Sequence, residues 1–147
     1  MSSYLTIYLQ PRKDDESGRK EPMALMAYSR NNDVYETMRE ELDIAYAGNE
    51  TCPYTELTAD KMELVVSSQK RTIDSIKRRV GSMRESLKYL SQKNCIDEKL
   101  EEIEELERYI EELEGQLEEL KFLATLVSMV KTESCWASFD KVLVNID

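Results

Sequence analysis

The sequence predicts an α+β protein in which a small head carries a long, projecting antiparallel coiled-coil helical hairpin. Three observations lead to this fold class: strand-like segments near both ends, two successive heptad patterns in the middle, and opposite net charges on those two patterns. We expect a single domain over residues 1–147. Its head, residues 1–57 and 132–147, holds about three short strands and one helix. The helical hairpin, residues 58–131, has its base embedded in the head.

Three segments have the composition of strands. Tyr4–Leu9 alternates and is rich in β-branched and aromatic residues, and Met23–Tyr28 is expected to return antiparallel to it after a polar loop at 11–22. Val142–Ile146 reads as a third strand, although a short helix is an alternative for residues 139–146. Together these segments predict a small sheet built from both ends of the chain.

A short helix is expected after the second strand. Asp33 followed by Glu36 has the spacing of a capping box, and Gly48 is the expected end of the helix. Its apolar stripe consists of Val34, Met38, Leu42 and Ala45. This stripe predicts a helix that packs on the head.

Two long helices follow. Thr58 is the expected N-cap of the first, whose periodic pattern continues to about Lys93. Asn94, with Asp97 three residues later, is the expected N-cap of the second, which runs to about Lys131.

The apolar positions of both helices recur at alternating spacings of three and four, the heptad signature of a coiled coil. In the first helix they are Met62, Val66, Gln69, Ile73, Ile76, Val80, Met83, Leu87 and Leu90. In the second they are Ile96, Lys99, Ile103, Leu106, Ile110, Leu113, Leu117, Leu120 and Ala124. In an antiparallel hairpin with a turn at 91–95, facing residues have numbers that sum to 186, and seven of the nine pairs are then apolar on both sides.

Charge supports the antiparallel pairing. Residues 70–93 contain eight basic and two acidic side chains, whereas residues 97–121 contain three basic and twelve acidic ones. A parallel self-dimer would place like charges together. The expected ion pairs across the hairpin are Lys70 with Glu114, Lys77 with Glu107, and Glu63 with Lys121.

Off-seam residues indicate what each part of the hairpin touches. Near the base both helices are apolar on nearly all sides, which is typical of buried helices. These base residues are Leu64, Val65, Phe122, Leu123, Leu126, Met129 and Val130. From Gln69 to Glu119 the helices are largely polar outside the seam. At 1.5 Å per residue, the roughly 25 residues from Gln69 to Lys93 make an arm that extends about 35–40 Å into water. We use the word arm for residues 69–117 of the two helices.

Two surfaces of the hairpin are candidate partner-binding sites. The first is a double row of outward-facing carboxylates, which either forms a solvated helix face or engages a basic partner. It consists of Glu104, Glu105, Glu111, Glu112, Glu118 and Glu119. The second is the tip, where Tyr89, Lys93 and Leu100 lie near the turn.

Composition excludes several classes of site. The chain has no His, so the residue that is the commonest general base and transition-metal ligand is missing. Its net charge is −10, so a polyanion such as nucleic acid is a poor partner. Three scattered cysteines fit reduced thiols, and no apolar run approaches the length of a membrane span. We therefore expect a cytoplasmic protein without catalytic residues, cofactor or metal.

These observations favour a non-enzymatic protein–protein interaction module, such as an adaptor, assembly factor or inhibitor, whose arm binds a protein partner. One alternative is an acidic nucleic-acid mimic, possibly phage-encoded, that blocks a basic groove. Another is a self-assembling structural component, because a homo-oligomer could form through the head.

Overall fold

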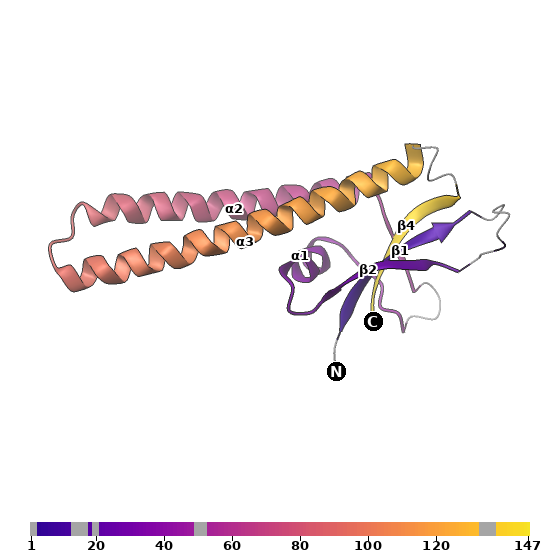
Figure 1. The fold of residues 1–147 in the computed structure, drawn as a ribbon, viewed down its shortest axis with the longest axis horizontal. Coiled ribbons are helices and arrows are strands. Elements are labelled where there is room, and N and C mark those ends of the chain that lie inside the picture. Colours follow the sequence, from indigo (N-terminus) through magenta and orange to yellow (C-terminus); the bar gives the residue numbers. More distant parts are fainter. Residues whose placement is uncertain (1–2, 13–17, 19–20, 49–52, 133–137) are drawn as a thin grey trace.

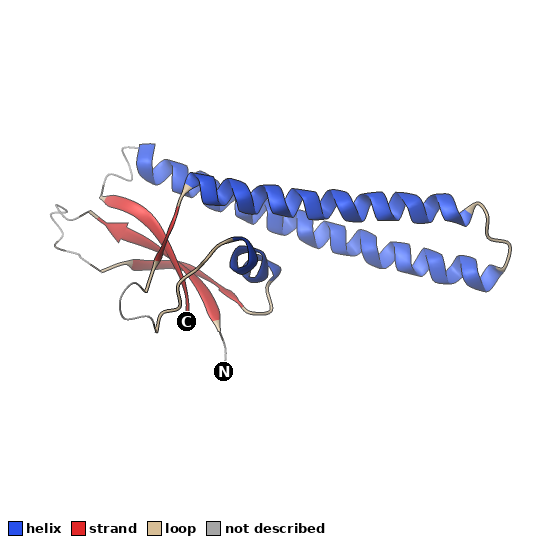
Figure 2. Cartoon of the chain, turned by 180° about the vertical axis from the view of Figure 1, so that it is seen from behind, coloured by secondary structure: helices blue, strands red, loops and turns tan. Residues whose placement is uncertain are grey.

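The computed structural model describes residues 3–12, 18, 21–48, 53–132 and 138–147. Four strands and three helices follow one another along this part of the chain, in an α+β arrangement (Figures 1 and 2). They are β1 (Tyr4–Pro11), β2 (Met23–Ser29), α1 (Asp33–Glu41), β3 (Thr55–Leu57), α2 (Ala59–Leu87), α3 (Lys93–Thr132) and β4 (Phe139–Ile146).

The four strands form one antiparallel sheet in the order β2-β1-β4-β3. The two strands nearest the chain ends, β1 and β4, are therefore its centre, and Leu5 lies opposite Ile146. The backbone N–H of Tyr4 donates to Asp147 Oδ1 at 2.8 Å, which holds the two ends of the described chain together. The predicted antiparallel return of β2 and the predicted strand at Val142–Ile146 are both confirmed, and the strand begins earlier, at Phe139.

The sheet has one strand more than the sequence predicted. β3 is only three residues long, and it pairs with β4 from Thr55↔Val144 to Leu57↔Val142. A segment this short has no detectable alternation of its own, and its strand conformation comes from its pairing with β4. It leads directly into α2.

Some predicted helix ends were wrong. Asn32, not Asp33, caps α1, because its side chain accepts a hydrogen bond from the N–H of Val34 at 2.8 Å. The helix ends at Glu41 rather than at Gly48, because the chain turns extended at Leu42.

The two long helices confirm the predicted start at Thr58, whose hydroxyl accepts from the N–H of Lys61. At the turn the prediction was less accurate. α2 ends at Leu87 rather than near Lys93, and α3 begins at Lys93, so Asn94 lies inside its first turn. α2 and α3 then pack against each other along their length (Figure 1).

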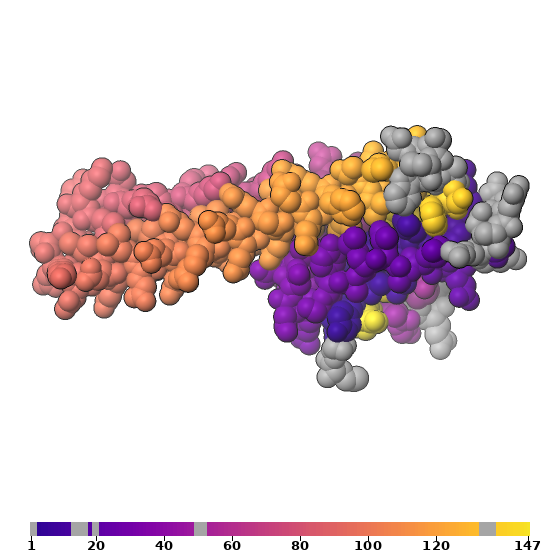
Figure 3. All heavy atoms as spheres, in the orientation of Figure 1, coloured from indigo at the N-terminus to yellow at the C-terminus, as the bar shows by residue number. Residues whose placement is uncertain are grey.

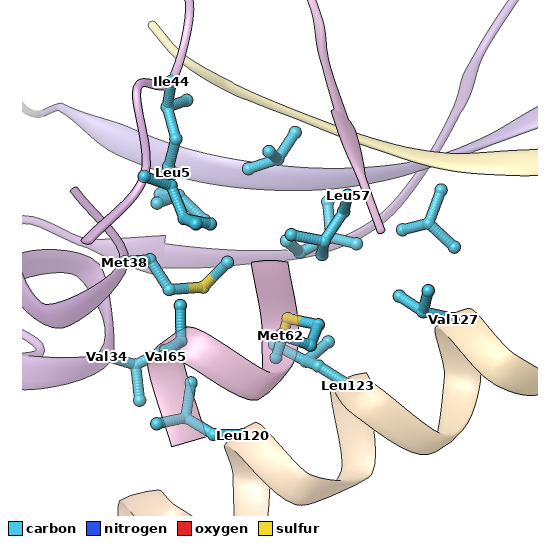
Figure 4. Close-up of a cluster of buried hydrophobic side chains, with 14 of the residues drawn as sticks. Leu5, Val34, Met38, Ile44, Leu57, Met62, Val65, Leu120, Leu123 and Val127 are labelled. Carbon is cyan, nitrogen blue, oxygen red and sulfur yellow. The ribbon is translucent and has the colours of Figure 1, made fainter. Parts of the chain in front are cut away.

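One hydrophobic cluster joins the sheet to the helices. Figure 4 shows Leu5 and Leu57 of the sheet gathered with Met62 of α2 and Leu120 and Leu123 of α3. All five side chains are at most 1 % exposed. The helices cover one face of the sheet, and the base of the hairpin is part of this core.

A second, separate cluster lies between α2 and α3 in the arm. Its buried members all belong to the predicted seam: Ile73, Val80, Met83, Ile103, Ile110, Leu113 and Leu117. Figure 3 shows this part of the two helices extending well beyond the rest of the molecule. Within the described residues, the distal arm is held together only by the contacts that α2 and α3 make with each other.

The sequence predicted that the base of the hairpin is buried on all sides, and this prediction was wrong. Val65, Leu123, Leu126 and Val130 are buried, whereas Leu64 and Phe122 are each 56 % exposed. The sheet packs against the helices from one side only, so apolar positions on their outer faces stay in contact with solvent.

The sheet contains one buried polar atom without a partner among the described residues, the side-chain oxygen of Asn145. Asn145 is 3 % exposed and lies opposite Thr6 in the β1–β4 ladder. We expect Asn145→Val to stabilise the protein by about 1 kcal/mol, because an unpaired buried carbonyl carries a desolvation cost and valine favours strands. Denaturant titration measures this. Asn145→Asp should destabilise the protein. Equal stability of the two variants would contradict the description of the Asn145 side-chain oxygen as buried and unpaired.

Candidate functional site

The predicted acidic rows lie on the surface of α3. All six glutamates are exposed, and Glu118 pairs with Lys121 on the same helix. The other five form no ion pair with any described residue. The structure divides the set in two, because Glu104, Glu105, Glu111 and Glu112 belong to the arm, whereas Glu118 and Glu119 lie beside β2.

The ion pairs across the hairpin differ from the predicted ones. Lys77 pairs with Glu114 at 2.8 Å, Arg84 with Glu107, and Arg79 with Glu102 at 3.6 Å. The predicted pairs Lys70–Glu114, Lys77–Glu107 and Glu63–Lys121 do not form.

The direction of helical side chains accounts for two of the three observed pairs, Lys77–Glu114 and Arg84–Glu107. Each Cα–Cβ bond tilts toward the N-terminus of its own helix. In an antiparallel pair, Lys77 and Glu114 therefore lean toward each other, whereas Lys77 and Glu107 lean apart. The hydrogen bond and charge of Glu114 raise the pKa of Lys77, so the pair remains charged over the neutral range.

A polar network connects α1 to both long helices at the start of the arm. Gln69, which is 3 % exposed, donates from Nε2 to the backbone oxygen of Leu113 at 3.1 Å and accepts from Thr37 at 3.4 Å. Gln116 donates to Asp33 at 3.0 Å. The polar residue in the seam is thus satisfied, and it marks where α1 leaves the hairpin.

The tip is highly exposed. Tyr89, which follows α2 directly, is 86 % exposed, and Leu100 is 40 % exposed. Lys93, the first residue of α3, is also exposed. Cys95 carries a free thiol there, and the other two cysteines lie outside the described residues.

A hollow of about 520 Å³ lies between α3 and β2, and its residues were not predicted as a site. It is lined by Met26, Tyr28, Glu118, Glu119 and Phe122, and we call it the β2 hollow. Three of these side chains are apolar or aromatic, and the other two are carboxylates. The sequence offered one signal, a phenylalanine on the outer face of α3, but that face was expected to be buried.

The environment of the β2 hollow changes the acidity of Tyr28. Burial and the nearby Glu119 carboxylate raise its pKa from 10.0 to about 12. Both effects disfavour the phenolate. Its hydroxyl donates to the sulfur of Met26 at 3.3 Å, so both side chains stay on the same wall of the hollow.

We expect Glu119→Gln to lower the pKa of Tyr28, because one of the two causes of its shift is removed. The unfolded chain loses this proton near pH 10, so this side chain's contribution to stability is complete below pH 10 and is lost as the pH rises toward 12. NMR titration of the tyrosine ring carbons measures the pKa. Glu112→Gln, which faces Tyr109, should leave Tyr28 unchanged. If Tyr28 lost its proton over the same pH range as the exposed Tyr89, the buried environment described for Tyr28 would be wrong.

The described part of the chain has no group of three or more acidic or cysteine side chains that could hold a metal ion. Searched over the same residues, no helix has the length and apolarity needed to cross a bilayer.

Comparison of the chain with protein-family models, with curated proteins and with solved structures finds no match.

Proposed function

We propose that the protein is a non-enzymatic interaction module, in which the head holds an antiparallel coiled-coil arm that binds a protein partner. It would act as an adaptor, assembly factor or inhibitor, and it requires no cofactor. The observation that supports this proposal is the arm itself. About half of the described chain outside the sheet forms a rod, and its buried cluster is distinct from the main core, with Val66 packed against both.

The buried seam residues of the distal part of this rod form a cluster between α2 and α3, and its tip exposes Tyr89 and Leu100. Aromatic residues that are exposed on a rigid support are favourable anchors in protein interfaces, because little side-chain freedom is lost on binding. The tip is therefore our candidate contact with a protein partner.

A symmetric shortening of the arm tests this function. Deleting residues 80–86 together with 100–106 removes one heptad from each helix and preserves the expected facing pairs. We expect the shortened protein and the tip variant Tyr89→Ser/Leu100→Ser to fold but to lose a partner that the intact protein captures from an extract of its native host. A matched control, Tyr46→Ser, removes another exposed tyrosine, 61 % exposed, from outside the hairpin. Equal capture by all variants would overturn the proposal.

The unpaired carboxylates support a second candidate, an acidic mimic of nucleic acid. Glu104, Glu105, Glu111 and Glu112 have no ion pair with described residues and are free to meet a basic groove. A mimic would lose binding steeply with added salt, as electrostatic interfaces do. It would also lose binding when Glu104 and Glu111 are changed to Lys, whereas a partner bound by the tip would tolerate both changes.

A further inference from the structure

β2 is an outer strand of the sheet, with β1 on one side and no strand on the other within the described residues. In an antiparallel ladder, residues alternate between pairs that exchange hydrogen bonds and pairs that turn their backbone groups outward. Arg30 donates to the carbonyl of Ser3 at 3.1 Å, which places Tyr28 and Met26 in the bonded pairs. Ala27 therefore directs its N–H and C=O away from β1, and no described residue bonds to them.

The side chains of β2 do little to block this edge. Residues 23–29 read Met-Ala-Leu-Met-Ala-Tyr-Ser, without the lysine or proline by which many proteins protect an outer strand. One protective feature is present, an irregularity in the β1–β2 register between Ile7 and Tyr8. It leaves residues 26–29 as a short regular edge, long enough to add a short strand.

The β2 hollow lies directly next to this edge. Met26 and Tyr28 of β2 and Phe122 of α3 line the space between the strand and the helix. A strand added beside β2 would turn alternate side chains toward this space. One such side chain would meet the exposed ring of Phe122, and the next would meet Glu118 and Glu119.

We propose that the β2 edge and the β2 hollow together bind an extended segment of another protein by strand addition, and that this segment carries an apolar residue and a lysine or arginine two positions apart, so that both side chains face the hollow. Backbone bonds to Ala27 would supply affinity, and the hollow would supply selectivity. Charge excludes a second copy of this chain as the favoured occupant. Two copies, each with a net charge of −10, would bring their Glu118 and Glu119 pairs to one shared edge.

This surface is separate from the arm and tip, so it can fail or succeed independently of the proposed function. The arm would still bind its partner with β2 blocked. Strand addition would likewise survive the loss of Tyr89 and Leu100.

The probe is a panel of blocked nine-residue peptides in which Val, Ile or Phe and Lys or Arg stand two positions apart, titrated into the full-length, ¹⁵N-labelled protein. We expect amide shifts that centre on Ala27 and Phe122. Peptides methylated on alternate backbone nitrogens keep their charge but lose the donors of one edge, so they should bind at least about tenfold more weakly. Equal binding of the methylated peptides would overturn the proposal, as would binding weaker than about 1 mM across the panel.

Two pairs of variants separate the edge from general charge attraction. Ala27→Pro removes only an outward N–H, a change that outer strands tolerate, and should weaken binding about tenfold, whereas Ala27→Val keeps the donor and should bind normally. Glu118→Lys/Glu119→Lys should weaken binding, and Glu98→Lys/Glu101→Lys, with the same charge change at exposed positions of α3, should not. Equal losses in the two charge variants would overturn the proposal. A dimer that Ala27→Pro dissociates and that the peptides do not displace would assign the edge to a second copy instead.

Discussion

Replacement of Leu120 by alanine is expected to destabilise the protein by about 3 kcal/mol, because the side chain is fully buried where sheet and hairpin meet. Leu120 belongs to the cluster that joins strands β1, β3 and β4 to α2 and α3. Truncation removes buried apolar atoms and leaves a cavity that this junction cannot easily close. Urea unfolding followed by circular dichroism measures the loss.

The matched control lies two residues away on the same helix. Phe122 is larger but 56 % exposed, so Phe122→Ala should change stability by less than about 0.5 kcal/mol. If the phenylalanine variant lost as much stability as the leucine variant, α3 would have a different orientation on the sheet from the one described.

Replacement of Ile103 by aspartate is expected to melt the distal arm while the sheet stays folded. Ile103 is 1 % exposed in the arm cluster, and a buried charge without a partner is among the most destabilising changes available. Because the arm cluster is separate from the core that contains β1 and β4, the disruption should remain local. Hydrogen exchange should show lost protection near residue 103 and unchanged protection in β1 and β4.

Leu100→Asp places the same charge three residues away at an exposed position, and it should leave exchange near residue 103 almost unchanged. Loss of protection in β1 and β4 in the Ile103 variant would show that arm and sheet unfold as one unit. The rod would then be part of the folding core and not a separable binding element.

The two long helices were predictable because their signals are local and repeated. Residues such as Ile73, Ile103 and Ile110 recur with the heptad period over many turns, and the structure buries all three together. A pattern that repeats over many turns can be recognised even where a single position departs from it. The position of a helix end, in contrast, depends on one or two residues. The start of α1 is an example, because Asn32 is the N-cap and Asp33, the predicted N-cap, is the first residue of the helix.

Features that depend on packing between distant segments were not predictable. β3 is a strand because β4 pairs with it, and a three-residue segment carries no pattern that shows this. The β2 hollow escaped prediction for a related reason. Whether Phe122 is buried depends on which side of α3 faces the sheet, and a helix that is apolar on nearly every face leaves that choice open.

The acidic rows were partly predictable. Heptad positions correctly placed Glu104 and Glu111 on the outer face of α3. The heptad did not show that Glu119 also faces Tyr28 of the sheet, because that contact depends on how the helix crosses β2. Sequence patterns thus indicated which side chains are exposed but not which of them share a site.

The order of the strands also sets an order for folding on the ribosome. β4 is inserted between β1 and β3, yet it is synthesised last, more than 120 residues after β1. Closing so long a loop is slow, but a hairpin that has already formed brings its two ends together and shortens the effective loop. We expect nascent chains that stop before residue 139 to have a formed hairpin and an open gap in the sheet, which β4 fills once it has been synthesised.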